Sequence, residues 1–215
     1  MKLSHAKYRA EADIRNIIFD WGGVITDLHV DDTIRALREL GNDKFDMLLK
    51  NGPNEIFKPF ETGSITPDEF HVRIRKYLDP ELSERQIDDA WSSMLGALPE
   101  ERWRVLEDVR NNYRTFLLSN TNYVHIHNYA KFIQRTYGTY GFFHLFEKVF
   151  LSYELGMRKP DEDIFLYVLE KEGLKPEETF FIDDTEENIL TASKLGMHAY
   201  LLEGNETLPD LFDIR

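Results

Sequence analysis

The sequence contains no cysteine, which excludes disulfides, thiolate metal sites and cysteine nucleophiles. Basic residues are also in the minority, because 26 lysines and arginines stand against 39 acidic residues and give a net charge of −13. A charge of this sign repels polyanions, and the sequence has no basic stripe of the kind that binds nucleic acid. We therefore expect neither DNA nor RNA as a partner.

Long hydrophobic runs are absent too. No apolar stretch approaches the roughly 20 residues that cross a bilayer, and residues 1–15 lack the apolar centre of a signal peptide. These absences predict a soluble cytoplasmic protein without membrane contact, and we expect a monomer or a weak homo-oligomer. Apolar residues nevertheless make up 42% of the 215 positions, which is enough to bury a sizeable core.

Short, continuous apolar runs recur along the chain and are typical of buried parallel strands. They cover residues 16–19, 115–118, 149–151, 179–182 and 199–202. Helical patterns lie between the later runs and end at Gly173 and Gly196. This alternation predicts an α/β fold with a doubly wound, Rossmann-like parallel sheet.

The segment 29–98 shows helix signals without matching strands. Thr66 with Glu69, and Ser83 with Gln86, have the spacing of capping boxes, which mark helix starts. We therefore predict an all-helical domain of residues 29–98. It would be inserted into an α/β core domain of residues 1–28 and 99–215.

Four of the predicted strands lead into polar residues. These are Asp20, Ser119, Lys159 just beyond the third strand, and Asp183 with Asp184. In an open parallel sheet such residues gather at one edge, where ligands bind. Three carboxylates at that edge would repel one another without a cation, and oxygen ligands suit Mg²⁺. With a phosphate held there by hydroxyl, N–H and lysine donors, an aspartate has the position to attack phosphorus.

Four segments resemble the ordered motifs of the haloacid dehalogenase superfamily: FDWGGVITD at 19–27, LLSNT at 117–121, GMRKP at 156–160 and FFIDDTEEN at 180–188. The helical insertion resembles that superfamily's small helical cap, and ETGSITPDEF at 61–70 is similar to a recurrent cap segment. The D-x-G-x-V form of the first motif, with SNT and GMRKP, most resembles bacterial sugar-1-phosphate phosphatases of the α-D-glucose-1-phosphate phosphatase type. The resemblance implies a phosphatase for small phosphate esters, with sugar-1-phosphates favoured.

The resemblance also implies a Mg²⁺ site. Asp20 would be both the nucleophile and a metal ligand, and the backbone carbonyl of Gly22 would be a second ligand. Asp184 would be the distal carboxylate on the ion. Asp183 would be either a ligand or an orienting group that acts through water.

The remaining motif positions imply a phosphate site. Ser119 and Asn120 would hold the phosphate, and Lys159 would neutralise the nucleophile and the transferring group. Asn188 would be a supporting polar residue behind the metal ligands.

Gly22 departs from the superfamily pattern. Its phosphatases usually carry an aspartate two residues after the nucleophile, where it protonates the leaving group and later activates water. General acid–base help of this kind is typically worth about 10²–10⁴-fold in rate. Without that acid, either another group or the substrate compensates, or activity is poor.

Two other functions stay open. A metal-independent 2-haloacid dehalogenase also uses an aspartate nucleophile, but Asp183 and Asp184 argue against it, because extra carboxylates serve no purpose in attack on an uncharged carbon. A catalytically weak binding or regulatory protein of the same fold is the second, because of Gly22. The pair His125 and His127 has a zinc-like spacing, but no further ligand cluster lies near it in the sequence.

Overall fold

A single parallel sheet forms the centre of the protein in the computed structural model, which describes residues 13–41, 44–51, 55–138 and 143–212. Its strand order is β3-β2-β1-β4-β5. The strands are β1 (Asn16–Phe19), β2 (Arg114–Ser119), β3 (Lys148–Leu151), β4 (Thr179–Asp183) and β5 (His198–Leu201). All five coincide with the predicted runs to within a residue, so the predicted α/β fold class is confirmed.

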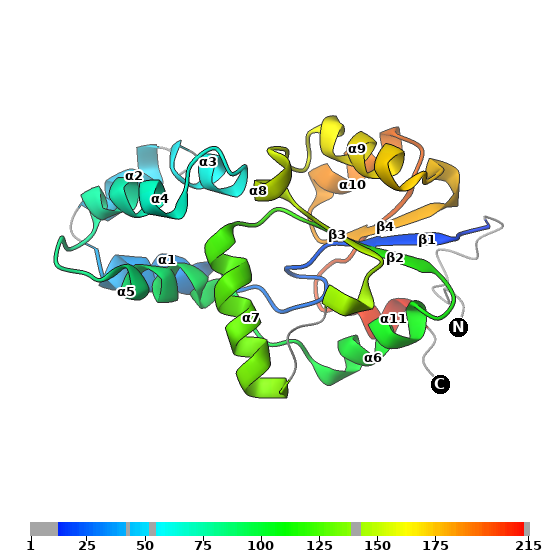
Figure 1. Cartoon of the computed structure of the whole chain (residues 1–215), viewed down its shortest axis with the longest axis horizontal. Helices are drawn as coiled ribbons and strands as arrows, with labels where there is room; N and C mark the ends of the chain where they lie inside the picture. Colours follow the sequence, from blue (N-terminus) through cyan, green and yellow to red (C-terminus); the bar gives the residue numbers. More distant parts are fainter. Residues whose placement is uncertain (1–12, 42–43, 52–54, 139–142, 213–215) are drawn as a thin grey trace.

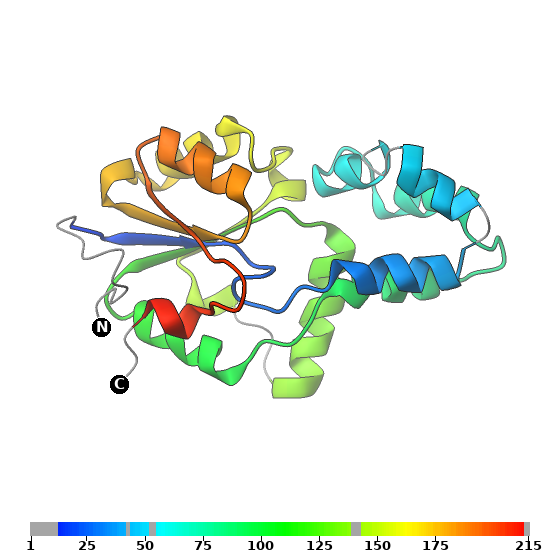
Figure 2. The same ribbon diagram turned by 180° about the vertical axis from the view of Figure 1, so that it is seen from behind.

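Helices cover both faces of the sheet (Figures 1 and 2). On one face lie α6 (Glu100–Val109), α7 (Tyr123–Tyr137) and α11 (Leu208–Leu211); on the other lie α9 (Glu162–Glu172) and α10 (Glu186–Lys194). Side chains of a strand alternate between these two layers. Accordingly, Ile17 and Phe19 pack into one buried cluster while Ile18 packs into the other.

The described part of segment 29–98 is helical and lies at one end of the molecule (Figure 1). Its helices are α1 (Val30–Glu39), α2 (Lys44–Asn51), α3 (Phe57–Glu61), α4 (Pro67–Ile74) and α5 (Glu84–Trp91). Both predicted capping boxes form, at the starts of α4 and α5. These helices, here called the cap, enclose an apolar cluster of their own. The domain boundaries at 28/29 and 98/99 stay a prediction.

The cap contacts the core through two separate sets of hydrogen bonds. On the α7 side, Asn128 donates to the Asp88 carbonyl at 3.2 Å, and the Trp91 indole donates to Asn122 at 3.4 Å. Near α8 (Ser152–Leu155), the Ser152 hydroxyl donates to the Glu61 carbonyl at 2.6 Å. The cap is therefore joined to the core on two sides.

A close backbone approach adds to the second contact. Gly63 has φ +64°, and a Cβ on it would lie 2.0 Å from the Tyr153 carbonyl oxygen. Only glycine fits such a conformation at such a distance. This explains the glycine in the cap segment ETGS.

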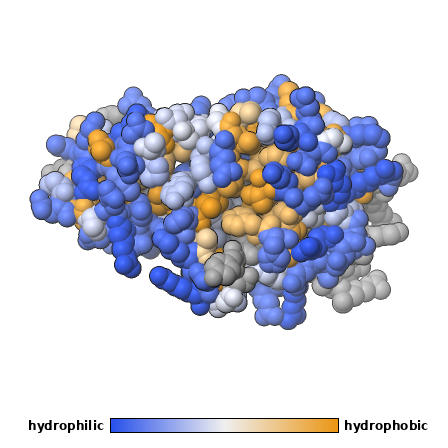
Figure 3. Space-filling model, viewed as in Figure 1, coloured by the Kyte–Doolittle hydropathy of each residue, from blue (hydrophilic) through white to orange (hydrophobic). Residues whose placement is uncertain are grey.

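The surface is mainly polar, as the many charged residues of the sequence lead one to expect. The face in Figure 3 is mostly hydrophilic, with hydrophobic residues gathered near its centre. Among the described residues, no helix is both long enough and apolar enough to cross a membrane. The sequence predicted no signal-peptide centre in residues 1–15, and residues 1–12 of that segment lie outside the described residues.

Candidate active site

The predicted polar residues lie together at the carboxyl edge of the sheet. Asp20 directly follows β1, Ser119 ends β2, and Asp183 ends β4 with Asp184 next to it. Parallel pairing brings these strand ends side by side, because Phe19 is in register with both Leu117 and Ile182. The topology therefore brings Asp20 and Asp184 together although most of the chain lies between them.

Lys159 joins two of the carboxylates. Its Nζ lies 2.8 Å from Asp20 Oδ1 and 2.6 Å from Asp183 Oδ2, and its side chain is only 1% exposed. Burial acts to lower the pKa of Lys159, but the two carboxylates outweigh burial and raise it. The lysine is therefore a fixed positive charge beside Asp20.

Asp183 is held on both of its oxygens. Oδ2 accepts from Lys159, while Oδ1 accepts from the Thr185 N–H at 2.9 Å and from Asn188 Nδ2 at 2.9 Å. Asn188 thus contacts Asp183 directly, and its supporting role behind the metal ligands stays a prediction. Of the two roles left open for Asp183, this arrangement favours the orienting one.

The acidic groups are arranged to accept a cation. Asp20, Asp183 and Asp184 each offer a carboxylate oxygen, and these oxygens lie within 4.8 Å of one another. Burial, together with the neighbouring carboxylates and against the opposing effect of Lys159, raises the pKa of Asp20 to about 7. Burial and Asp183 likewise raise the pKa of Asp184. Three carboxylates against one ammonium group leave excess negative charge, so this oxygen donor set fits Mg²⁺.

The loop after Asp20 packs tightly against Asp184. Gly23 has φ +75°, and a Cβ there would lie 2.0 Å from Asp184 Oδ2, so the chain requires glycine at this position. Gly22 precedes it and lines the same cavity as Asp20. The role of the Gly22 carbonyl as a metal ligand stays a prediction.

The side chain of Asn120, expected to hold the phosphate, makes hydrogen bonds to the backbone of Lys159. Its Nδ2 donates to the Lys159 carbonyl at 2.8 Å, and its Oδ1 accepts from the Lys159 N–H at 2.9 Å. The amide therefore fixes the backbone of Lys159. This leaves the Asn120 backbone N–H and the second amide hydrogen as its available donors to a phosphate.

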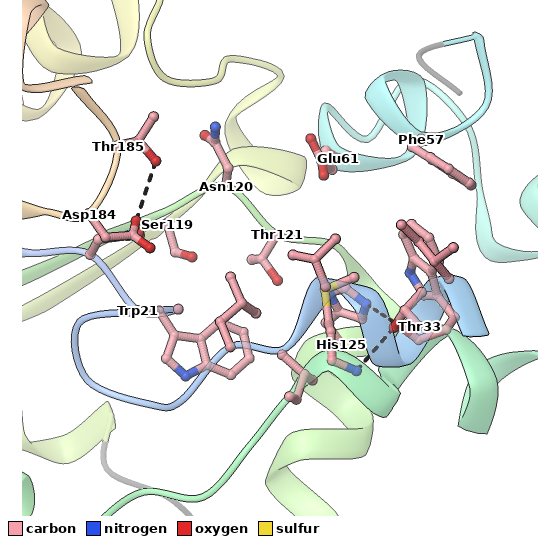
Figure 4. Close-up of a pocket in the computed structure, with 18 of the residues that line it drawn as sticks. Trp21, Thr33, Phe57, Glu61, Ser119, Asn120, Thr121, His125, Asp184 and Thr185 are labelled. Carbon is pink, nitrogen blue, oxygen red and sulfur yellow. Dashed lines mark hydrogen bonds between the residues drawn. The ribbon is translucent and has the colours of Figure 1, made fainter. Parts of the chain in front are cut away.

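The next residue, Thr121, was not singled out from the sequence. Its hydroxyl is buried and has no hydrogen-bond partner among the described residues, although it lines the cavity. Figure 4 shows Ser119 and Thr121 on the same side of the cavity as Asp184. An unpaired buried hydroxyl is costly, which makes Thr121 a further candidate donor to a ligand. Its position directly after Ser119 and Asn120 was the available signal.

A cavity of about 550 Å³ separates the acidic site from the cap. Asp20, Ser119, Lys159 and Asp184 line it on the core side, and residues of α1, α2, α3 and α5 line it on the cap side. Its volume is within the range of about 300–1,000 Å³ that is usual for ligand pockets. The site therefore has room for a small molecule next to Asp20.

The two histidines of α7 do not form a metal site. His125 is buried, with Nε2 3.0 Å from the Trp91 carbonyl, whereas His127 is exposed. Burial lowers the pKa of His125 to about 4. Within the described residues, Asp20, Asp183 and Asp184 form the one cluster of potential ligands that lie close enough together to share a metal ion.

A parallel α/β sheet with an acidic, lysine-containing site at its carboxyl edge and a helical cap over that site defines the class of protein. The chain belongs to the haloacid dehalogenase-like hydrolase family, whose model matches residues 14–196.

Curated relatives include two phosphatases. The D-ribitol-5-phosphate phosphatase of Bacteroides thetaiotaomicron is 30% identical over 87% of this chain and 91% of its own length. A sesquiterpene phosphatase of Aspergillus oryzae is 27% identical over 84% of this chain and 85% of its own length.

Solved structures agree with the fold. A family enzyme of B. thetaiotaomicron, in complex with magnesium and inorganic phosphate, is 37% identical with a TM-score of 0.82, over 93% of this chain and 99% of its own. A family hydrolase of Porphyromonas gingivalis is 36% identical with a TM-score of 0.79, over 88% and 91%. A dehalogenase structure with a TM-score of 0.57 is 16% identical and shows likeness of fold alone.

Proposed function

We propose that this chain is a Mg²⁺-dependent phosphatase of small phosphate monoesters that works through an aspartyl-phosphate on Asp20. The observation that carries the proposal is the buried Lys159, which lies between Asp20 and Asp183 while Asp184 faces the cavity. A B. thetaiotaomicron relative with magnesium and phosphate, and a second relative named as a phosphatase, support it.

The proposed reaction has two displacements at phosphorus. A carboxylate oxygen of Asp20 attacks, the ester P–O bond breaks, and the leaving oxygen departs with the bonding electrons and takes up a proton. Water then attacks the same phosphorus, the bond to Asp20 breaks, and inorganic phosphate leaves. Lys159 stays charged beside Asp20 throughout and attracts the transferring group.

The other site residues bind and orient. Ser119 and Thr121 would donate hydroxyl hydrogen bonds to phosphate oxygens, and Asn120 would hold Lys159 in place. Asp20, Asp184 and the Gly22 carbonyl would hold the Mg²⁺ ion, with Asp183 oriented behind them by Asn188. When bound, the ion supplies positive charge that offsets the phosphate dianion and the carboxylates.

Removing the metal tests this function against dehalogenation. EDTA is expected to reduce phosphate release from a panel of phosphate monoesters to background, and excess Mg²⁺ is expected to restore it. The reason is that three clustered carboxylates cannot approach a phosphate dianion without a cation. The measurement is phosphate release, with chloride release from 2-chloropropionate in parallel. Chloride release that is unaffected by EDTA would support the dehalogenase alternative, and no release of either ion would support a binding or regulatory role.

The glycine at position 22 affects which leaving groups we expect the protein to prefer. Without an acid at this position, the leaving oxygen departs with less proton transfer, and the largely dissociative transition state makes the rate sensitive to leaving-group acidity. We therefore expect sugar-1-phosphates, aryl phosphates and acyl phosphates to react faster than sugar-6-phosphates or glycerol phosphate. The two curated relatives are named for a polyol phosphate and a sesquiterpene phosphate, so their names do not single out one alcohol.

Restoring an acid at position 22 tests this reading. A Cβ on Gly22 would lie 3.1 Å from Leu28 Cδ2, so Leu28 partly fills the space an aspartate needs. We expect G22D combined with L28A to speed hydrolysis of the poorest leaving groups at least about tenfold over L28A alone, and of aryl phosphates by less than roughly threefold.

The measurement is kcat/KM across esters of graded leaving-group acidity. A flat dependence in the native protein would mean that another group donates the proton. Asp27, which pairs with Arg102 at 3.0 Å, and Glu61 of the cap are then the groups to substitute next.

A further inference from the structure

The cavity beside Asp20 has two walls of opposite chemistry. The core wall is polar and carries the candidate catalytic and phosphate-binding groups. Among the described residues, the cap wall is apolar at every lining position except Thr33 and Glu61. Its side chains come from α1, α2, α3, the end of α5 and the turn after it, and include Val30, Ile34, Leu49, Phe57, Met94 and Leu95.

Most polar groups of the cap wall are already bonded within the protein. The Thr33 hydroxyl donates to the Trp91 carbonyl at 2.9 Å and accepts from the Met94 N–H at 3.0 Å. The Trp91 indole N–H donates to Asn122. Glu61, the one charged side chain among the described residues of this wall, lies 3.1 Å from Arg158.

A core residue beside this wall, His125, adds no charge. His125 stacks on Trp91 with ring centroids 5.1 Å apart, and burial keeps it neutral near pH 7 by lowering its pKa to about 4. Figure 4 shows His125, Thr33 and Phe57 on the side of the cavity away from Asp184 and Ser119. The space that receives the leaving group is therefore bounded mainly by hydrocarbon and aromatic surface.

We infer that the alcohol portion of the substrate is apolar, an aryl or hydrocarbon alcohol rather than a sugar or polyol. This inference rests on the proposed phosphatase function and names the substrate class for the same site. A phosphate held at the core wall leaves its ester group facing the cap wall. Hydroxyl groups buried there would lose water and gain few partners, whereas an apolar group is favoured by its removal from water. Among the esters favoured by leaving-group acidity, the cavity thus selects aryl phosphates over sugar-1-phosphates.

The test compares n-hexyl phosphate with D-ribitol-5-phosphate in the presence of Mg²⁺. Both are esters of primary alcohols, and the hydroxyl-rich ribitol is the more acidic alcohol, so leaving-group acidity alone favours the polyol. We expect kcat/KM to be at least tenfold higher for n-hexyl phosphate. Equal values, or a preference for ribitol-5-phosphate, would overturn the inference while leaving the phosphatase function established.

A pair of variants checks that the cap wall causes the preference. Ile34 lines the cavity and is half-buried on α1, so I34N adds polarity there without opening the cap cluster. We expect I34N to lower the ratio of kcat/KM for hexyl phosphate over ribitol-5-phosphate at least fivefold. The matched control is L166N, because Leu166 is exposed on α9 and does not line the cavity. An unchanged ratio in I34N would contradict the inference.

Ligand binding separates this inference from the proposed function. Hexylphosphonate and methylphosphonate cannot be hydrolysed at the P–C bond by this reaction, and their affinities are measured by calorimetry with Mg²⁺. We expect hexylphosphonate to bind at least tenfold more tightly. That result without turnover of any ester would reject the phosphatase proposal and keep the apolar ligand class. Equal affinities would reject the apolar ligand class whatever the turnover.

Discussion

Replacing Asp20 by asparagine is expected to reduce phosphate release at least about 10³-fold, because no other group takes over a covalent route once the nucleophile is lost. Asparagine has nearly the same size, so the loss is chemical rather than steric. D20N also removes one carboxylate from a cluster of three around Lys159. We therefore expect its metal-free form to be no less stable than the native protein.

The measurements are phosphate release with Mg²⁺ and thermal unfolding in EDTA. A matched control is D31N, because Asp31 is exposed in the first turn of α1 and does not line the cavity. D31N should retain nearly native turnover. Ordinary turnover by folded D20N would reject Asp20 as the nucleophile.

Replacing Lys159 by methionine should have the second large effect. The variant keeps the length of the side chain but removes the charge that lies 2.8 Å from Asp20 and 2.6 Å from Asp183. Loss of one partner from a buried ion pair costs about 3–5 kcal/mol, so metal-free K159M should be markedly less stable than the native protein. Its turnover should fall by more than about tenfold, roughly 1.4 kcal/mol in the barrier.

The effect of Mg²⁺ on the melting temperature of K159M is a second measurement. The ion supplies positive charge to the same carboxylates, so it should raise the melting temperature of K159M more than that of the native protein. The control is K175M, because Lys175 is an exposed partner of Glu178 at 2.9 Å. A rate loss of less than about tenfold in K159M would exclude Lys159 from the phosphate site.

The sequence was sufficient to predict the sheet and the residues at its edge. Buried parallel strands are covered on both faces, so they read as continuous apolar runs, and polar residues that follow such runs must meet at the carboxyl edge. The capping boxes at Thr66 and Ser83 were also predictable from the sequence, because each depends on two residues only three positions apart.

Contacts between distant segments were not predictable in the same way. The bond between Asn120 and the Lys159 backbone, the place of Leu28 beside Gly22, and the pair of Glu61 with Arg158 all depend on how the cap and loops pack. The apolar cap wall is of this kind too. Its residues satisfy the helical periodicity of an ordinary core, and only the structure shows which of them also face the cavity.

The stereochemical course at phosphorus tests the central claim most directly. Each in-line displacement inverts the configuration, so transfer to Asp20 followed by transfer to water gives overall retention. A phosphorothioate monoester made chiral by sulfur and two oxygen isotopes at its non-bridging positions is hydrolysed with Mg²⁺ in water of the third isotope, and the configuration of the inorganic thiophosphate is determined. The account predicts retention. Inversion would mean that water attacks the ester directly, and would contradict the covalent role of Asp20.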